Sequence, residues 1–168
     1  MQPFEARVVP SLLDRLTDYA PASHTENPLN RSQALRALKA SLWRDLTTLL
    51  NTKRREEELP EGFPETNQSL LTYGLPDFLS YSLRSIYDQQ KLRRAIETTI
   101  RKFEPRLEKV SVALVNAKGE PRDPSDTDSA LHFRVDALLR IDPAPEPVSF
   151  ETLLQPDIGH FVVLGESR

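Results

Sequence analysis

The sequence has no cysteine, only five glycines and no long hydrophobic run. The absence of cysteine excludes disulfide bonds, thiolate metal sites and cysteine nucleophiles. The glycine-containing phosphate loops and nucleophile elbows (GxxxxGK, GxGxxG and GxSxG) are also missing from the sequence. No stretch reaches the ~18 consecutive apolar residues expected of a membrane-spanning helix. The chain therefore lacks the usual sequence markers of nucleotide binding, serine hydrolysis and membrane insertion.

The first residues, Met1–Glu5, lack the basic segment followed by an apolar one that is typical of a secretory signal. Acidic residues outnumber basic ones by 25 to 22, which gives a net charge of −3. Binding to nucleic acid or to an anionic membrane would require a clustered basic face. We therefore expect a cytoplasmic protein that binds no nucleic acid and does not insert directly into a membrane.

The first half of the chain has a helical pattern. Asn30 followed by Gln33 is typical of a capping box, which predicts a helix from Arg31 to Thr52. The apolar residues of this segment recur every three or four positions, and they are Leu35, Leu38, Leu42, Leu46 and Leu49. One face of this helix is therefore expected in the core.

Two further helices are expected between Asp77 and Glu104. A turn at Tyr73–Pro76 leads to a short helix opened by Asp77, and Asp88 is expected to cap a longer helix. The apolar stripe of the longer helix consists of Leu92, Ile96, Ile100 and Phe103. This helix should end at Glu104, because the residue before a proline is disfavoured in the α conformation.

After Pro105 the pattern changes to that of β-strands. A first strand is expected around Val110, Val112 and Leu114, and others near residues 148–153 and 161–164. The clearest strand has an apolar residue at every other position, namely Leu131, Phe133, Val135, Ala137, Leu139 and Ile141. Helices followed by strands with one dry face predict an α+β fold: N-terminal helices packed on one face of a mostly antiparallel C-terminal β-sheet.

Residues 1–30 are predicted to form an N-terminal arm and linker outside the main domain, which covers residues 31–168. Within the arm, a serine-capped turn of helix places Leu12, Leu13 and Leu16 on one side. A helix this short is unstable alone in water, so its leucines need a surface to pack on. The sequence leaves open whether that surface belongs to this domain or to a partner.

The sequence offers no convincing metal or cofactor site. Its three histidines, His24, His132 and His160, are far apart and lack the helical i, i+4 pairing of a zinc site. We therefore predict neither a metal nor a cofactor.

Paired carboxylates are the strongest enzymatic alternative, because a glycosidase needs one carboxylic acid and a second carboxylate ~5–9.5 Å away. Glu104 is the candidate acid of such a peptidoglycan hydrolase (a muramidase), with Asp136 or Glu97 as its partner. Glu104 is, however, close in sequence to Arg101 and Arg106. Nearby cations favour the ionised carboxylate, which is the wrong form for a general acid. We therefore predict that the protein is not an enzyme.

Glu104 is unusual for a second reason. It lies at the C-terminal end of a helix, where the helix dipole already places negative charge. In an extended link through Pro105, Glu104 and Arg106 point the same way and Leu107 points to the opposite side. The sequence allows two interpretations: a local salt bridge of little energetic value, or a rigid polar contact for a partner.

Four short segments carry a resemblance to a known family. They are PSLLDRL at residues 10–16, RDL followed by LLNTKR within residues 44–54, YGLPD at 73–77 and EPRL at 104–107. In this order and at these separations the chain resembles the TssE family, the small lysozyme-like baseplate wedge subunits of type VI secretion systems. This family is related to the small wedge protein of contractile phage tails. Position 53 is more usually arginine in the family, and is Lys53 here.

The resemblance implies a structural subunit of the cytoplasmic baseplate that is assembled at the inner membrane. It implies binding to the wedge proteins TssF and TssG, and contact with the contractile sheath subunits TssB and TssC, which join by sharing β-strands. The family signature places Glu104, Pro105, Arg106 and Leu107 among the partner-binding residues. Our hypothesis is that an exposed sheet edge templates sheath strands while Glu104 and Arg106 orient them. A second hypothesis is that Leu12, Leu13 and Leu16 dock on TssF and TssG.

Overall fold

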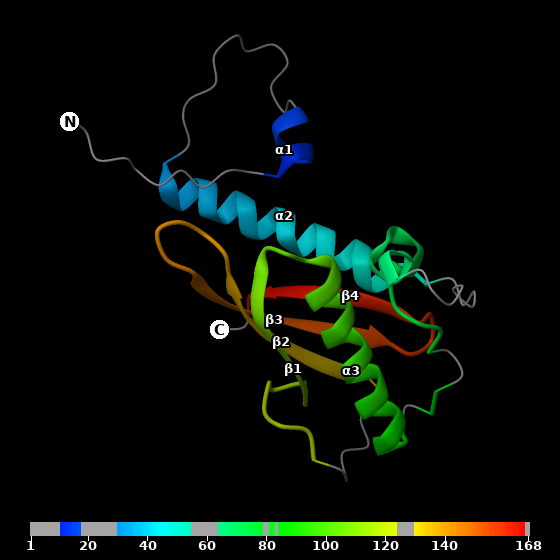
Figure 1. The fold of residues 1–168 in the computed structure, drawn as a ribbon. Helices are drawn as coiled ribbons and strands as arrows, with labels where there is room; N and C mark the ends of the chain where they lie inside the picture. The colour runs from blue at the N-terminus through cyan, green and yellow to red at the C-terminus, as the bar shows by residue number, and fades with distance from the viewer. Residues whose placement is uncertain are drawn as a thin grey trace, which may run out of the picture.

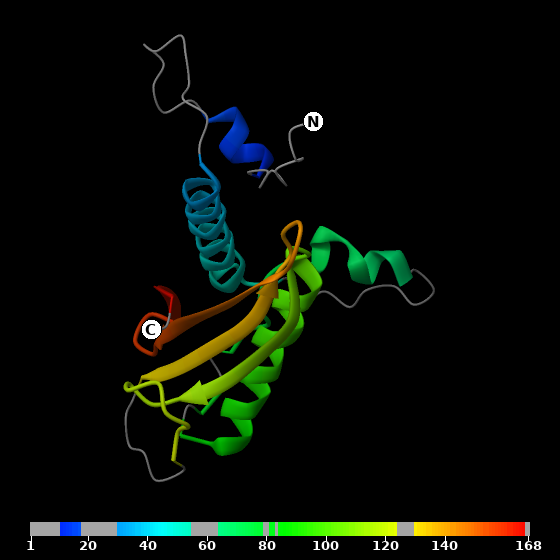
Figure 2. The same ribbon diagram turned by 90° about the vertical axis from the view of Figure 1, so that its left-hand side faces the viewer.

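The α+β fold predicted from the sequence is confirmed (Figure 1). The computed structural model describes residues 11–17, 30–54, 64–78, 81–82, 84–123 and 130–166. Within these ranges, helices precede a single sheet of four antiparallel strands. Helices α2 and α3 lie on one face of that sheet, and Figure 2 shows no helix on its other face in the part of the chain that is described.

Helix α2 (Arg31–Asn51) forms where the capping box predicted it. The Asn30 side chain accepts a hydrogen bond from the backbone N–H of Gln33, and the Gln33 side chain accepts one from the backbone N–H of Asn30. The predicted stripe is buried from Leu38 to Leu49, and Leu35 packs against its margin. The local cap and the apolar stripe predict the same helix, and because they agree, α2 could be predicted from the sequence.

Helix α3 (Ile86–Phe103) begins three residues earlier than expected. Its N-cap is Ser85, whose hydroxyl accepts from the backbone N–H of Asp88, so the prediction that Asp88 caps the helix is wrong. Asp88 lies in the first turn, where an acidic side chain interacts favourably with the helix dipole. The helix ends as predicted, with Glu104 as its C-cap.

Among the described residues, no helix follows Asp77, because residues 76–78 and 81–82 are irregular; residues 79, 80 and 83 lie outside the described residues. Two 3-10 helices precede this region instead: η1 (Pro64–Gln68) and η2 (Leu70–Thr72). The predicted turn is present at Gly74, which has a positive φ of 98°. A Cβ atom there would lie 2.1 Å from the carbonyl oxygen of Thr52, so only glycine allows this close approach.

The sheet is a meander in the order β1-β2-β3-β4. The strands are β1 (Leu107–Val115), β2 (Leu131–Leu139), β3 (Glu146–Gln155) and β4 (His160–Glu166). In β2 every second residue from Leu131 to Leu139 is buried, as the alternation predicted. The first strand is less regular than expected, because a bulge between Glu108 and Ser111 includes Lys109 with a φ of 52°.

The core lies between the inner face of the sheet and the two long helices. Helix α3 packs beside β1, and α2 packs beside β4. The largest buried side chains come from both layers and include Leu42, Leu46, Ile96, Phe133, Phe150 and Phe161. The turn from α3 into β1 lies beside α2, because Arg106 of the turn contacts Asp45 of the helix. This turn contains the residues singled out from the sequence.

Candidate functional site

The turn from α3 into β1 is a rigid junction. Its backbone is held by a hydrogen bond of 3.1 Å from the Leu107 N–H to the Glu104 carbonyl. The Arg140 N–H donates to the carbonyl of Arg106 at 2.8 Å, which ties the junction to the chain just beyond β2. Pro105 restricts the backbone between these two contacts. The junction is therefore fixed by main-chain bonds on both sides of the proline.

Glu104 and Arg106 form a two-pronged ion pair at this junction. Arg106 Nε donates to Glu104 Oε1 at 2.6 Å, and Nη2 donates to Oε2 at 2.5 Å. The Glu104 side chain is only 6% exposed, compared with 26% for Arg106. The contact with Glu104 is the main cause that raises the pKa of Arg106 above its ordinary value. This parallel pairing is the strong form of an arginine–carboxylate contact, because it fixes orientation as well as charge.

The same guanidinium reaches across to α2. Arg106 Nη2 donates to Asp45 Oδ2 at 2.8 Å, and Asp45 also lies 3.5 Å from Nε of its neighbour Arg44. The charges thus alternate in sign from Glu104 through Arg106 and Asp45 to Arg44. The ion pair between Arg106 and Asp45 connects the junction to α2. The carboxylates of Glu104 and Asp45 therefore share one guanidinium group.

Helix α1 (Leu12–Leu16) extends this chain of contacts to the arm. Arg44 Nη1 donates to Asp14 Oδ1 at 2.9 Å, and the hydroxyl of Ser11 donates to the other oxygen of Asp14 at 2.5 Å. The hydrogen bond from Ser11, followed by the contacts with Ser41 and Arg44, lowers the pKa of Asp14 from 3.8 to about 2. The contacts between α1 and α2 in the described residues are therefore polar, and they stabilise the ionised form of Asp14.

These contacts surround a surface cavity of about 350 Å³. Its lining residues come from all four sequence segments of the resemblance, and they are Ser11, Asp45, Leu49, Tyr73, Phe103, Glu104, Pro105 and Arg106. The Tyr73 and Phe103 rings meet edge to face, with 5.2 Å between their centroids. Burial, together with the charges of Asp45 and Glu104, raises the pKa of the Tyr73 hydroxyl. Segments that are far apart in the sequence thus meet at one place. We call this cavity and its lining the junction pocket.

A second contact region joins the two middle segments of the resemblance beside the pocket. Lys53 forms an ion pair with Asp77. The backbones run side by side there, since the Leu75 N–H donates to Thr52 at 2.9 Å and the Arg54 N–H donates to Leu75 at 2.7 Å. The close approach requires Gly74. The YGLPD segment is therefore explained by packing against the end of α2.

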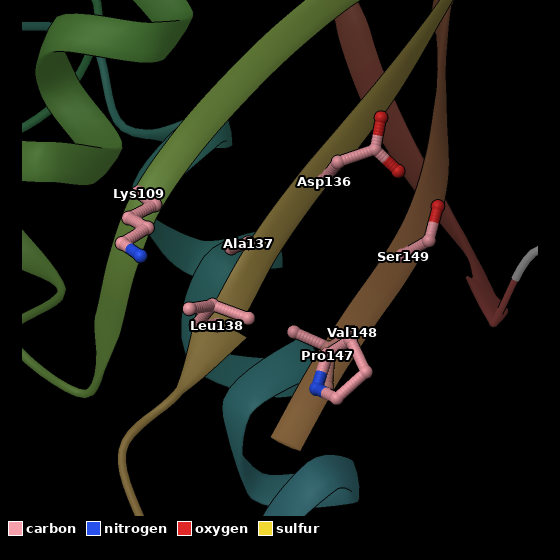
Figure 3. Close-up of a pocket in the computed structure, with 7 residues that line it drawn as sticks. All are labelled: Lys109, Asp136, Ala137, Leu138, Pro147, Val148 and Ser149. Carbon is pink, nitrogen blue, oxygen red and sulfur yellow. The ribbon is translucent and has the colours of Figure 1, made fainter. Parts of the chain in front are cut away.

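The geometry does not favour the glycosidase alternative. Both oxygens of Glu104 accept hydrogen bonds from Arg106, whereas a general acid must carry a proton that it can deliver to the substrate. Glu97 is held instead by Arg93 at 2.9 Å and Arg101 at 2.7 Å on α3. Asp136 lies on the outer face of the sheet, beside a shallow depression that it shares with Ser149 and Lys109 (Figure 3). The structure therefore brings neither candidate partner to the junction pocket.

The histidines do not form a metal site in the described part of the chain. His132 lies on β2 and His160 begins β4, and no cluster of three potential ligands occurs among the residues that are described. The remaining histidine, His24, lies outside the described residues.

The predicted partner-binding residues fall into three groups. Glu104, Pro105 and Arg106 line the junction pocket, and Leu107 is buried in the core with an exposure of 6%. The leucines of α1 are on the surface: Leu12 is 70% exposed, Leu13 59% and Leu16 75%. Among the described residues, these leucines do not pack into the domain core, and their binding to a partner stays a prediction.

Sequence reasoning missed Asp45 and Tyr73. Both lie within the short segments that carried the resemblance, which was the only available signal. Asp45 follows Arg44 on the charged side of α2, where a solvated carboxylate is the ordinary expectation. Its role depends on Arg106, which is 61 residues away in sequence.

The fold and the pocket define a class of protein: a small α+β domain in which charged residues of the junction join separate segments of the chain. Comparison with protein families supports this class and makes it specific. The model of the baseplate wedge protein gp25 family matches residues 36–144, which is more than half of the chain. The chain belongs to this family of structural baseplate proteins, which includes the TssE subunits of type VI secretion. Comparison with curated proteins gives no significant match.

In the ranges that the structure describes, no helix combines the length and the apolar character needed to cross a bilayer.

Proposed function

We propose that this chain is a structural baseplate wedge subunit of a type VI secretion system. One observation carries the proposal: the four signature segments converge on the junction pocket, where their charged side chains bind one another. Such an arrangement stabilises a defined surface shape and contains no free acid–base pair. Family membership supports the baseplate role, and the choice of type VI secretion over a phage tail rests on the sequence resemblance.

The proposed partners on the wedge side are TssF and TssG. The surface offered to them has a polar part, formed by Glu104, Pro105 and Arg106, and an apolar part, formed by the exposed leucines of α1. Leu107 contributes indirectly, because its burial anchors the start of β1. We further propose that residues 31–168 form the lysozyme-like wedge domain and residues 1–30 its arm, which agrees with a family match that begins at residue 36.

On the sheath side, the proposed partners are TssB and TssC. A sheet with an open edge can pair with an extended segment of another subunit, because its outer N–H and C=O groups lack strand partners. Such a subunit would act in the cytoplasm, within the baseplate at the inner membrane.

The test is a comparison of Glu104→Gln with the control Glu108→Gln. Both variants remove one negative charge, but Glu108 pairs with Arg140 at 3.0 Å on an exposed part of β1 and does not line the pocket. Replacing Glu104 breaks a buried pair, so we expect a loss of about 1–3 kcal/mol in unfolding free energy.

Function is measured on the variants at a temperature where both are folded. We expect Glu104→Gln to lose co-purification with TssF and TssG and to assemble few fluorescent sheaths in cells, while Glu108→Gln behaves as the unaltered protein. Normal wedge binding and sheath assembly by a folded Glu104→Gln variant would reject the role of the junction. Release of muropeptides from peptidoglycan by the unaltered protein, lost in Glu104→Gln, would reject the structural proposal in favour of a hydrolase.

A further inference from the structure

The bulge at the start of β1 changes the direction of one side chain. The ladder register shifts between Glu108 and Ser111, so Lys109 and Val110 together oppose Ala137 of β2. Ala137 is buried on the inner face of the sheet, and a residue opposite it in a regular ladder would also point inward. Val110 takes that inner position and is 2% exposed. The bulge therefore leaves the side chain of Lys109 on the surface.

The backbone of Lys109 would suit a glycine better. Its φ of 52° lies in the left-handed region, which residues with a Cβ atom rarely adopt and which glycine often occupies in bulges. The bulge is fixed by Arg101 of α3, which donates to the Val110 carbonyl through Nε at 3.1 Å and Nη2 at 2.5 Å. Since local backbone stability does not favour lysine here, we looked for its role in what the side chain can contact.

The Lys109 side chain borders the depression on the outer face of the sheet, which has a volume of about 520 Å³. Leu138 and Pro147 are paired on neighbouring strands beside it, and Asp136 and Ser149 form the next pair along these strands (Figure 3). Figure 2 shows no helix over this face in the part of the chain that is described. The depression thus combines an apolar surface with a cation at its border.

Lys109 carries an uncompensated charge. In the ranges that the structure describes, its side chain makes no ion pair and no hydrogen bond. The charged residues around it are paired with each other: Glu108 with Arg140 at 3.0 Å, and Asp136 with Arg134 at 3.3 Å. The local balance is therefore positive, and it favours an acidic group on whatever binds the depression.

The shape and position of the depression indicate the kind of ligand. It is too shallow to enclose a small molecule, as ligand pockets do, so a side chain presented by another protein fits it better. It also lies close to the junction. Arg140 donates its backbone N–H to the Arg106 carbonyl at 2.8 Å, and its side chain pairs with Glu108 just before the bulge. A partner that contacts the junction is therefore near enough to contact both.

We propose that the outer-face depression is a second docking site for the wedge partner TssF–TssG, and that it binds an apolar side chain flanked by a carboxylate. Lys109 pairs with the carboxylate, and Leu138 and Pro147 pack against the apolar side chain. The inference rests on the proposed function, because it adds a contact with the same partner. It assigns a role to a face of the sheet that takes no part in the junction pocket.

The first test separates stability from binding. Glycine adopts a positive φ readily, so we expect Lys109→Gly to raise the melting temperature by about 2–4 °C. The same variant should bind the TssF–TssG complex about tenfold more weakly, because the cation is lost. Lys109→Arg keeps the charge and should bind as the unaltered protein does. Lys118→Gly is the matched control, since it removes the same charge from the turn beyond the other end of β1.

The outcomes of this test are distinct. Unchanged affinity of Lys109→Gly, or an equal loss in Lys118→Gly, would overturn the proposal. Self-association of Lys109→Gly with full affinity would also overturn it, and would show that the lysine protects the edge of β1 from pairing with another chain. If the unaltered protein does not bind TssF–TssG, the proposed wedge contact fails and this inference fails with it.

The second test locates the contact without changing Lys109. Because the chain has no cysteine, Ser149→Cys places a single thiol in the depression, and Lys118→Cys places one outside it. Alkylation by N-ethylmaleimide is followed by mass spectrometry on the full-length chain. With TssF–TssG at about ten times its dissociation constant, we expect alkylation of Ser149→Cys to slow by about tenfold and that of Lys118→Cys to stay the same. An unchanged rate for Ser149→Cys in a complex that forms would reject the docking site and leave the wedge contact standing.

Discussion

Helices α1 and α2 have similar N-terminal caps, but the leucines of α2 are buried and those of α1 are exposed. Each has a polar cap residue, Ser11 or Asn30, whose side chain accepts a hydrogen bond from the backbone three residues on. Each is rich in leucine at helical spacing. The leucines of α2 from Leu38 to Leu50 are at most 6% exposed, whereas those of α1 are at least 59% exposed. A capped leucine pattern therefore predicts a helix but does not predict what the leucines contact.

Length explains the difference. With 21 residues, α2 spans the sheet and buries a complete stripe, whereas α1 has 5 residues and is held to α2 through Asp14 and Ser11. A helix that short gains too little from its own hydrogen bonds to be stable alone. The side of α1 that faces α2 makes polar contacts, so the leucines of α1 stay exposed and can contact another surface. The following predictions test this division, in order of decreasing effect on stability.

The largest effect is expected from Leu46→Ala in α2. Leu46 is fully buried, so its truncation leaves a cavity, and we expect the unfolding free energy to fall by about 2–5 kcal/mol. Chemical denaturation measures this loss. The matched variant in α1, Leu13→Ala, should change stability by less than about 0.5 kcal/mol, because Leu13 is exposed. Equal losses in the two variants would show that α1 belongs to the core.

The next effect concerns the caps. Asn30→Ala removes the capping box of α2, and we expect a loss of about 1 kcal/mol in unfolding free energy. Ser11→Ala removes the cap of α1 and should leave global unfolding unchanged, since α1 is not part of the core. Thermal melts of the two variants provide the comparison. A larger loss in Ser11→Ala than in Asn30→Ala would contradict it.

Arg44→Gln tests the polar attachment of α1. Arg44 bridges Asp14 at 2.9 Å and Asp45 at 3.5 Å, and its side chain is 42% exposed. Exposed ion pairs contribute about 0–1 kcal/mol, so we expect a small change in global stability and a release of α1 from α2. The release should appear as faster exchange of the Leu16 and Thr17 amides, with no change in α2. Unchanged exchange in α1 would show that other contacts hold it.

The same attachment should depend on pH. The pKa of Asp14 is lowered from 3.8 to about 2 by Ser11 and by Arg44, so the contact favours the ionised carboxylate. Its contribution is therefore complete above about pH 4 and is lost as the pH falls through about 2. Titration of the Asp14 carboxyl by NMR measures this directly. The Arg44→Gln variant should shift the midpoint upward, and an unchanged midpoint would leave Ser11 and Ser41 as the causes.

No stability loss is expected when Leu12, Leu13 and Leu16 are all replaced by serine, because these side chains are exposed. Binding should change greatly, since the replaced surface is the one proposed for TssF and TssG. Co-purification with TssF and TssG measures the effect, and Leu70→Ser, which alters an equally exposed leucine of η2, is the control. Retained wedge binding by the triple variant would reject the role of the arm.

Much of this fold was readable from local patterns. The capping box and stripe of α2, the alternation of β2 and the end of α3 at Glu104 are set by neighbours within a few residues, so the sequence displays them directly. The Glu104–Arg106 pair was also expected, because only Pro105 separates the two residues. The N-cap of α3 was misplaced, since Ser85 and Asp88 are both acceptable caps and packing decides between them.

Residue order thus determined the α+β class, the principal elements and the ion pair at the junction. Tertiary structure alone brought Asp45 and Tyr73 to that junction, turned the leucines of α1 outward, and placed Arg93 and Arg101 on the carbonyls at the edge of β1. The physical reason is the distance along the sequence over which each kind of interaction acts. Caps, alternation and proline act between residues that are close in sequence, whereas a charged side chain or a sheet edge takes its role from whatever the folded chain places beside it.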